Sequence, residues 1–273
     1  MKTTLHRIFF LFTCLFFFLC SPLAAQEAAS DPNQLLADYS TALAVTPDND
    51  DLYAKRGEIY FNQGRFDLAL SDFTRAIEIN PSNVGALSWR GYLYEKTGSV
   101  ELAIADYSQA IIGDPAYAYP HIRRGQLLFT KGQADEAIAD YSQAIELEPQ
   151  SAEPYVSRGI IYRNKGLIDA AIADYSKAIE LNPRYPVAYF NRAVAYSKQS
   201  RFDLAINDYN KVLELDPHDT LAYFNKAVAC EQVQDYSEAI RAYQLFIQHS
   251  PEQTGSKLDY ARIRLQELAG IIL

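Results

Sequence analysis

Beyond the first 25 residues, the side chains best suited to catalysis or metal binding are three histidines and one cysteine, and they lie far apart in the sequence: His121, His218, His249 and Cys230. No two of these histidines have the spacing of a metal-binding pair. No glycine-rich loop follows a strand, so a phosphate-binding motif is also missing from the pattern. We therefore expect no catalytic residue, no metal site and no cofactor, and we predict that the protein is not an enzyme.

One basic and one acidic position recur every 34 residues. The bases are Arg56, Arg90, Arg124, Arg158, Arg192 and Lys226, and the acids are Asp38, Asp72, Asp106, Asp140, Asp174 and Asp208. Joining each acid to the base 18 residues downstream leaves none of them unpaired. We therefore predict a ladder of ion pairs between consecutive repeats. A binding site would not need a copy in every repeat, so this ladder is expected to set the register of neighbours.

These charges belong to a longer repeated pattern. The heptapeptide AIADYSQ at 103–109 returns at 137–143 and, as AIADYSK, at 171–177. Prolines keep the same 34-residue interval: Pro47, Pro81, Pro115, Pro149, Pro183, Pro217 and Pro251. A fixed period of this length is typical of stacked supersecondary units. The sequence therefore predicts repeats in place of one globular core.

Each repeat is predicted to form two helices. Six full repeats are expected, at 50–83, 84–117, 118–151, 152–185, 186–219 and 220–253. In the first, Gly64 ends the first helix and Asp67 suits the start of the second. The glycine recurs in three further repeats, and Ser200 and Gln234 replace it in the last two. The first helices also carry a small residue where helices approach closely: Gly57, Gly91, Gly125, Gly159, Ala193 and Ala227.

Half a repeat precedes these six, and one helix follows them. Asp31 suits an N-cap and Pro32 the first position of a helix that is expected to run to about Val45. Ser256 is expected to begin a final helix that ends near Ala269 and covers the exposed end of the last repeat.

The pattern resembles the tetratricopeptide repeat over residues 32–270. The resemblance rests on the period, the small residue of the first helix, the closing proline and an aromatic residue four positions after an alanine in the second helix: Phe73, Tyr107, Tyr141, Tyr175, Tyr209 and Tyr243. It implies an all-α, right-handed superhelical solenoid of antiparallel helix pairs with a C-terminal capping helix. It also implies that the first helices line a concave surface and that the protein is an interaction scaffold. The expected domains are a signal peptide (1–25), a linker with the half repeat (26–49), six repeats (50–253) and the capping helix (254–273).

The first 25 residues have the pattern of a secretory signal. Lys2 and Arg7 precede an apolar run from Ile8 to Cys20, and small residues up to Ala25 suit cleavage. The run is too short to span a bilayer, although a retained anchor and lipid attachment at Cys20 remain alternatives. We therefore expect export: to the periplasm or cell envelope in a bacterium, and otherwise into the secretory pathway. The mature chain is expected to have no membrane span.

The charge of the chain bears on its partners. Its formal net charge is −9, and removal of the two basic residues of the signal would lower it to −11. Such a charge argues against nucleic acid and anionic membranes as partners. After cleavage only Cys230 remains, so no intrachain disulfide is expected.

The first helices of the later repeats carry a second apolar stripe, beyond the one that a stack requires. We group these residues with Tyr92 of the second repeat as candidate groove residues. The set is Tyr92, Tyr119, Ile122, Phe129, Val156, Ile160, Val187, Phe190, Val194, Leu221, Phe224 and Val228. The resemblance implies that they face the concave groove, where a protein or peptide partner would bind. Arg163, Asn164 and Lys198 are expected near its edge. Part of the stripe is alternatively ordinary packing between repeats.

Two other functions stay open. The protein could carry a small hydrophobic ligand as an accessory to transport, or it could self-associate through its apolar C-terminal tail, 270–273. The Lys/Asn clamp with which some tetratricopeptide proteins hold a terminal carboxylate does not match as a set. Asn191 and Asn225 match one of its positions, but its lysines are missing.

Overall fold

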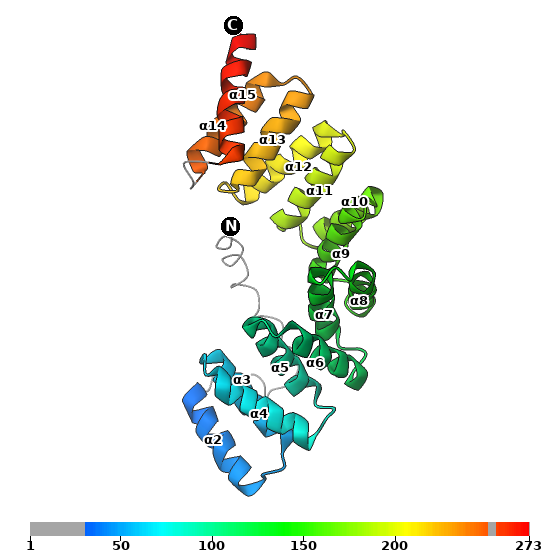
Figure 1. The fold of residues 1–273 in the computed structure, drawn as a ribbon, viewed down its shortest axis with the longest axis vertical. Helices are drawn as coiled ribbons and strands as arrows, with labels where there is room; N and C mark the ends of the chain where they lie inside the picture. The colour runs from blue at the N-terminus through cyan, green and yellow to red at the C-terminus, as the bar shows by residue number, and fades with distance from the viewer. Residues whose placement is uncertain (1–30, 251–254, 273) are drawn as a thin grey trace. The chain divides into compact units, whose positions relative to one another are not determined.

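The structure is a computed structural model that describes residues 31–250 and 255–272, and these residues fold as helices (Figure 1). The predicted signal peptide lies outside the described residues. The helices are α2 (Pro32–Val45), α3 (Asp50–Asn62), α4 (Phe66–Ile79), α5 (Val84–Thr97), α6 (Val100–Gly113), α7 (Ala118–Thr130), α8 (Ala134–Leu147), α9 (Ala152–Asn164), α10 (Ile168–Leu181), α11 (Pro186–Lys198), α12 (Phe202–Leu215), α13 (Thr220–Gln232), α14 (Tyr236–His249) and α15 (Ser256–Ile272). The predicted all-α class is confirmed. None of the described helices is both long and apolar enough to cross a membrane.

The chain divides into two compact units, Met1–Asp114 and Pro115–Leu273. In the first unit, α3 pairs with α4 and α5 with α6, while α2 packs on α3 and α4 on α5. The second unit holds the pairs α7–α8, α9–α10, α11–α12 and α13–α14, and α15 packs on α14. Within that unit the first helices also contact one another in the order α7, α9, α11, α13. Stacked helix pairs, as predicted, therefore build each unit.

The turn inside each helix pair needs a residue with positive φ. Glycine occupies it in four repeats, with φ between 73° and 83°. Ser200 (φ 59°) and Gln234 (φ 64°) occupy it in the last two. Backbone amides close this turn onto the last carbonyls of the first helix, for example Gln133 N to Leu128 O at 2.9 Å. The same backbone hydrogen bonds close the turn in every repeat, so they hold Ser200 and Gln234 in a conformation that favours glycine. The turn position is the one that the sequence predicted.

Small residues lie where the two helices of a pair cross. A Cβ atom added to Gly159 would lie 2.7 Å from the Tyr175 ring, and one added to Gly57 would lie 2.7 Å from the Phe73 ring. At Gly125 the nearest heavy atom would be 3.2 Å away. The predicted need for close approach is therefore confirmed, and it is strictest in the first and fourth repeats.

The predicted starts of the second helices need a correction. Each second helix begins one residue before the position aligned with Asp67, which lies in the first turn of α4. The N-cap of α4 is Arg65, which makes no side-chain capping bond. The acids therefore complement the positive end of the helix dipole without capping its free amides. The N-cap of α14, Asp235, does cap, since its carboxylate accepts a bond from Glu238 N. At the other end of the chain, Asp31 and Pro32 begin α2 as predicted.

The predicted ladder of ion pairs between repeats is wrong. Each arginine pairs with the acid 16 residues downstream, inside its own repeat: Arg56–Asp72, Arg90–Asp106, Arg124–Asp140, Arg158–Asp174 and Arg192–Asp208. Arg158 shows the geometry, with Nε 2.9 Å from Asp174 Oδ2 and Nη2 2.8 Å from Oδ1. Lys226 pairs with Glu238 because Ala242 replaces the acid, and Asp38 accepts a bond from Gln34.

Helix geometry explains the error. Arg158 does reach the preceding repeat, but its Nη1 binds Ser142 Oγ at 3.0 Å. Ser142 follows Asp140 by two residues, so the two side chains point about 200° apart around α8. The hydroxyl therefore faces the next repeat, while the carboxylate faces Arg124 in its own. The link between repeats is therefore a hydrogen bond that the charged guanidinium donates to a neutral hydroxyl. Arg56, Arg90 and Arg192 make the same bond to Ser40, Thr74 and Ser176.

Candidate binding surface on the first helices of the second unit

Eleven of the twelve predicted groove residues lie in the second unit, on the first helices α7, α9, α11 and α13. Tyr92 lies on α5 in the first unit. Of the eleven, Val187 and Leu221 are the exposed ones, at 37% and 45%. Val156 is 3% exposed and belongs to the core. The others are half-buried: Tyr119, Ile122, Phe129, Ile160, Phe190, Val194, Phe224 and Val228. We name the set without Val156 and Tyr92 the inner stripe.

Several residues of the inner stripe also pack inside the unit. The Phe190 ring lies 5.8 Å from the Tyr209 ring in an edge-on arrangement. The Phe224 ring lies 5.2 Å from Phe246 and 5.9 Å from Tyr260. Part of the predicted stripe thus serves packing, as the alternative reading allowed, and its free surface centres on Val187 and Leu221.

A register of tyrosine hydroxyls runs beneath the first helices. The second-helix tyrosine of a repeat usually meets an acceptor near the end of its own first helix. Tyr107 donates to Glu95 at 3.2 Å and Tyr243 donates to Glu231 at 2.6 Å. Tyr209 is also hydrogen-bonded to the residue at this position, Ser197, in a bond that lowers the tyrosine pKa.

The fourth repeat breaks this register. Its tyrosine, Tyr175, is fully buried, and the hydroxyl has no hydrogen-bond partner. The residue that corresponds to Glu95, Ser197 and Glu231 is Arg163, which has only donors. An arginine therefore stands where the second, fifth and sixth repeats place a side chain that can accept a hydrogen bond, whereas the third repeat has Phe129 there and its Tyr141 bonds to Ser157 of the next repeat.

The surroundings of Arg163 are neutral. Its Nη1 donates to Asn191 Oδ1 at 3.0 Å, and Asn191 Nδ2 donates to Val187 O at 2.8 Å, which fixes the amide orientation. Burial raises the pKa of Tyr175 and of Tyr209 to about 12, although the charge of Arg163 opposes the shift. Both tyrosines are neutral at pH 7, and no acid among the described residues forms an ion pair with Arg163. Of the other predicted edge residues, Asn164 and Lys198 are exposed.

Sequence reasoning placed Arg163 at the edge of the groove but missed its set with Tyr175 and Asn191. The sequence does contain a sign of this set, because the aligned position changes from Glu95 through Phe129 to Arg163 in consecutive repeats. It also missed an aromatic cluster in the first unit, where the Phe61 ring lies 5.3 Å from Trp89 and 5.4 Å from Tyr92.

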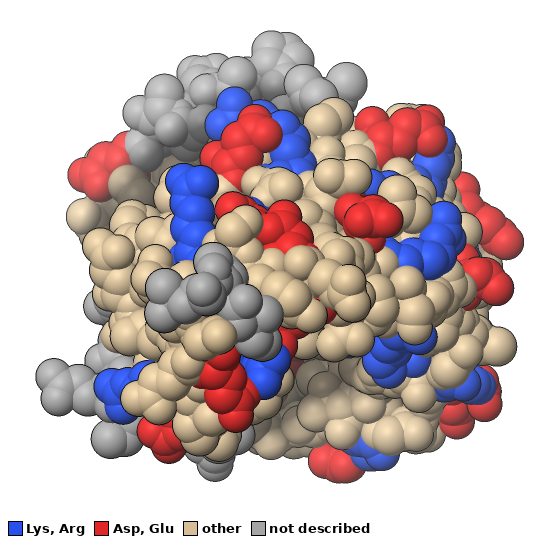
Figure 2. Space-filling view, turned by 90° about the horizontal axis from the view of Figure 1, so that it is seen from above, with Lys and Arg blue, Asp and Glu red and all other residues tan. Residues whose placement is uncertain are grey.

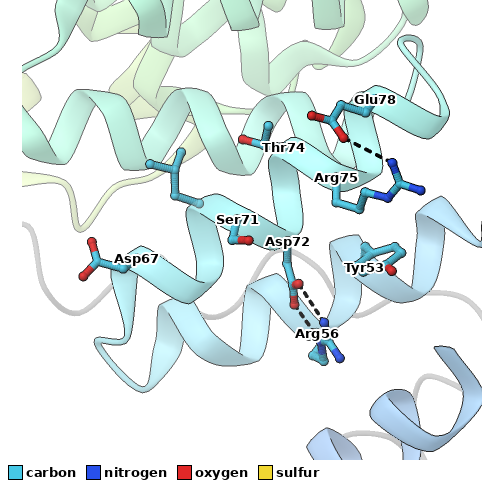
Figure 3. A pocket seen from close by; sticks show the side chains of 9 residues that line it. Tyr53, Arg56, Asp67, Ser71, Asp72, Thr74, Arg75 and Glu78 are labelled. Carbon is cyan, nitrogen blue, oxygen red and sulfur yellow. Dashed lines mark hydrogen bonds and ion pairs between the residues drawn. The ribbon is translucent and has the colours of Figure 1, made fainter. Parts of the chain in front are cut away.

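A separate hollow of about 560 Å³ lies in the first unit, between α3 and α4 (Figure 3). Its lining is polar, and both of its arginines are paired: Arg56 with Asp72, and Arg75 with Glu78 at 3.2 Å. The paired charges leave little for a ligand to bind. This hollow shares no residue with the inner stripe, and the unpaired charge of Arg163 makes the inner stripe the better candidate.

Charge is mixed on the face shown in Figure 2, where Lys and Arg residues are interspersed with Asp and Glu over a mostly uncharged surface. Cys230 is 1% exposed, and burial raises the pKa of its thiol to about 11, so the thiol is protonated at neutral pH. His121 Nδ1 lies 3.2 Å from Asp140 Oδ1 inside the third repeat. Within the described ranges, no three His, Cys, Asp or Glu side chains gather as metal ligands would.

Models of known protein families match the chain at the repeats described above. Models described as "Tetratricopeptide repeat" match residues 51–83, 84–111 and 186–219, and a model described as "TPR repeat" matches 125–166 and 159–200. No curated protein sequence matches the chain.

Solved structures of repeat proteins share the fold. The crystal structure of MamA protein is 24% identical, with 61% of this chain and 91% of that chain covered and a TM-score of 0.57. YrrB, described as "a TPR protein with an unusual peptide-binding site", is 22% identical over 66% and 93% of the two chains, with a TM-score of 0.58. Pseudomonas aeruginosa pilF is 19% identical over 81% and 96%, with a TM-score of 0.65. At such identities these likenesses establish the fold alone.

Proposed function

Because the chain belongs to the tetratricopeptide-repeat family, we propose that it is an exported interaction scaffold that binds a polypeptide segment on the inner stripe of repeats 3–6. The observation that carries the proposal is the pair of exposed apolar side chains Val187 and Leu221. They occupy the same position in consecutive repeats, on helices that contact each other. YrrB, which is described as binding peptide, has the same fold and supports the analogy.

The geometry favours an extended partner. Val187 lies one turn of α11 before Phe190 and two turns before Val194, and Leu221, Phe224 and Val228 repeat this spacing on α13. Residues at these intervals share one helix face. Two parallel rows of apolar groups, with polar atoms of Asn191 and Arg163 beside them, suit a segment that alternates apolar and polar side chains.

Affinity capture in the protein's own host tests the proposal. The bait should carry V187S and L221S together, since both side chains are exposed and their loss leaves the core packed. The matched control is L204S, because Leu204 is also 37% exposed but lies on α12, a second helix. A protein partner that is retained by the wild type and L204S, but lost from the double variant, supports the proposal. Retention by all three baits contradicts it.

The same preparation separates the alternatives. Native mass spectrometry that finds a bound apolar small molecule and no protein would favour a carrier in transport. A concentration-dependent mass that falls when 270–273 are removed would favour self-association. Export is tested by N-terminal sequencing of the protein from its host: a start at Gln26 supports cleavage after Ala25, and a start at Met1 contradicts it.

A further inference from the structure

We propose that the bound segment carries an Asp or Glu side chain whose carboxylate binds Arg163, with apolar side chains of the segment on either side. This inference rests on the proposed function, since it specifies the chemistry of the polypeptide that the inner stripe receives. Three observations carry it: an arginine without an acid, a buried hydroxyl without a partner, and apolar surface on both sides.

Arg163 differs from the repeated arginines. Arg158, on the same helix, has a bidentate bond to Asp174 and a further bond to Ser142. Arg163 is half-buried and makes one hydrogen bond, to the neutral amide of Asn191. A guanidinium has five N–H donors, so four remain without an acceptor among the residues that the structure describes. Carboxylates suit such donors best, because two parallel bonds form at once.

Tyr175 supplies the second observation. Tyrosine hydroxyls at its position donate to Glu95 in the second repeat and to Glu231 in the sixth, and Tyr209 in the fifth is hydrogen-bonded to Ser197. Arg163 cannot accept this proton, and the buried hydroxyl is left without any partner. An unpaired buried donor is costly. A carboxylate at Arg163 has enough lone pairs to accept hydrogen bonds from the guanidinium and from the Tyr175 hydroxyl. The second bond requires a small shift of the Arg163 side chain.

The position of Arg163 within the second unit indicates that the carboxylate belongs to a side chain inside the bound segment and not to the C-terminus of that segment. Arg163 lies on α9, which contacts α7 on one side and α11 on the other. Ile122 and Phe129 on α7, and Phe190 and Val194 on α11, continue the apolar surface in both directions. A segment that uses this surface passes over Arg163 and continues beyond it, so the carboxylate falls within the segment.

The net charge of −9 means that nonspecific attraction would not select acidic peptides. An acidic chain repels acidic peptides in general, so selection of carboxylates requires a local cation. The probe is a phage library of random twelve-residue peptides fused through their C-termini, which offers internal carboxylates without free C-terminal ones. The purified full chain is used as bait, and selected peptides are synthesised with amidated ends.

We expect the selected peptides to share an Asp or Glu next to apolar residues. Changing that residue to Asn or Gln, or changing Arg163→Gln, should each weaken binding about tenfold to a hundredfold, the range for a charged hydrogen bond. The two changes together should cost no more than either one. Arg184→Gln is the matched control, because Arg184 is exposed, lies in the turn before α11 and loses the same charge. It should bind as the wild type does.

Tyr175→Phe separates binding from folding. It removes a hydroxyl without a partner, so stability should be unchanged or higher while peptide affinity falls severalfold. Tyr209→Phe is its control and should lower stability, because that hydroxyl is bonded to Ser197.

The outcomes distinguish the two proposals. Selected peptides without an acid, or equal binding by R163Q, would overturn the carboxylate inference and leave the peptide groove standing. Selection of peptides only from a second library with free C-termini would replace the internal carboxylate with a terminal one and overturn the inference as stated. If neither library yields a binder, the proposed peptide groove fails, and the inference fails with it.

Discussion

The pairing of Arg158 with Asp174 makes a quantitative prediction. Asp174 is 6% exposed, and two nitrogens of Arg158 lie within 2.9 Å of its carboxylate oxygens. Removing one partner of a buried pair leaves an uncompensated charge and typically costs about 3–5 kcal/mol. The Arg158 side chain is 18% exposed, which lets water reach the guanidinium, so we expect about 3 kcal/mol for Asp174→Ala.

The coupling between the partners is the sharper quantity. Four double-mutant cycles combine alanine at Asp140 or Asp174 with alanine at Arg124 or Arg158. The two pairs within a repeat, Arg124–Asp140 and Arg158–Asp174, should show coupling of about 2 kcal/mol, as charged hydrogen bonds do. The crossed pairs should show less than about 0.5 kcal/mol, because they share no direct contact.

Urea denaturation followed by circular dichroism measures these free energies. A nearest-neighbour analysis is needed, since repeats unfold as coupled units and not always in one step. Ser142→Ala provides the matched control for the link between repeats and should cost about 1 kcal/mol. Coupling between Asp140 and Arg158 that equals the coupling between Arg158 and Asp174 would refute the geometry described above.

Four further predictions concern a turn, the thiol and the titration of buried groups at low and at high pH. Gln234→Gly should raise the free energy of unfolding by about 1 kcal/mol in the same denaturation assay, because glycine adopts φ 64° without strain; a lower stability would contradict this. The Cys230 thiol should react with DTNB at pH 8 only after urea is added, and prompt labelling of the native chain would show that it is exposed. Burial raises the pKa of Asp140, but bonds from Arg124 and His121 outweigh it, so the folded pKa lies below the ordinary 3.8. Its stabilisation is therefore complete above pH 3.8 and lost as pH falls through the folded value, and Asp140→Asn should flatten this acid limb of the stability curve. At high pH the free energy of unfolding should fall between about pH 10 and 12, because unfolding lets Tyr175 and Tyr209 ionise at the ordinary pKa of 10 while burial raises that pKa to about 12 in the folded chain, and ultraviolet absorbance should show their ionisation in that range.

Local patterns predicted most of the fold because a helical repeat is built from contacts that are close in sequence. The positive-φ turn at Ser200 and the close approach at Gly159 follow from the aligned positions of other repeats. The same logic found α2 with its cap at Asp31. Each repeat position occurs six times in the sequence, so a residue type that recurs for a structural reason is easily separated from one that occurs by chance.

The candidate site was less predictable, since periodicity tells which residues share a face but not how deeply each is covered. Val156 and Val187 occupy the same stripe in sequence, but one belongs to the core and the other is exposed. Neighbouring repeats cover a side chain to a degree that depends on the bulk of residues one and two repeats away. Phe224 illustrates this, because it meets Tyr260 of α15 across a contact that no repeat pattern contains.

The sequence by itself determined the repeat, its length, the helix pairs and their turns, because these depend on residue type and spacing. Only the tertiary structure decided the partners of the charges. Arg158 could reach acids in two repeats by count, and the rotation of α8 turns a serine and not an aspartate toward it. Likewise, the missing acceptor at Tyr175 emerges only when α9 and α10 are packed together, since an unpaired group is a property of everything around it.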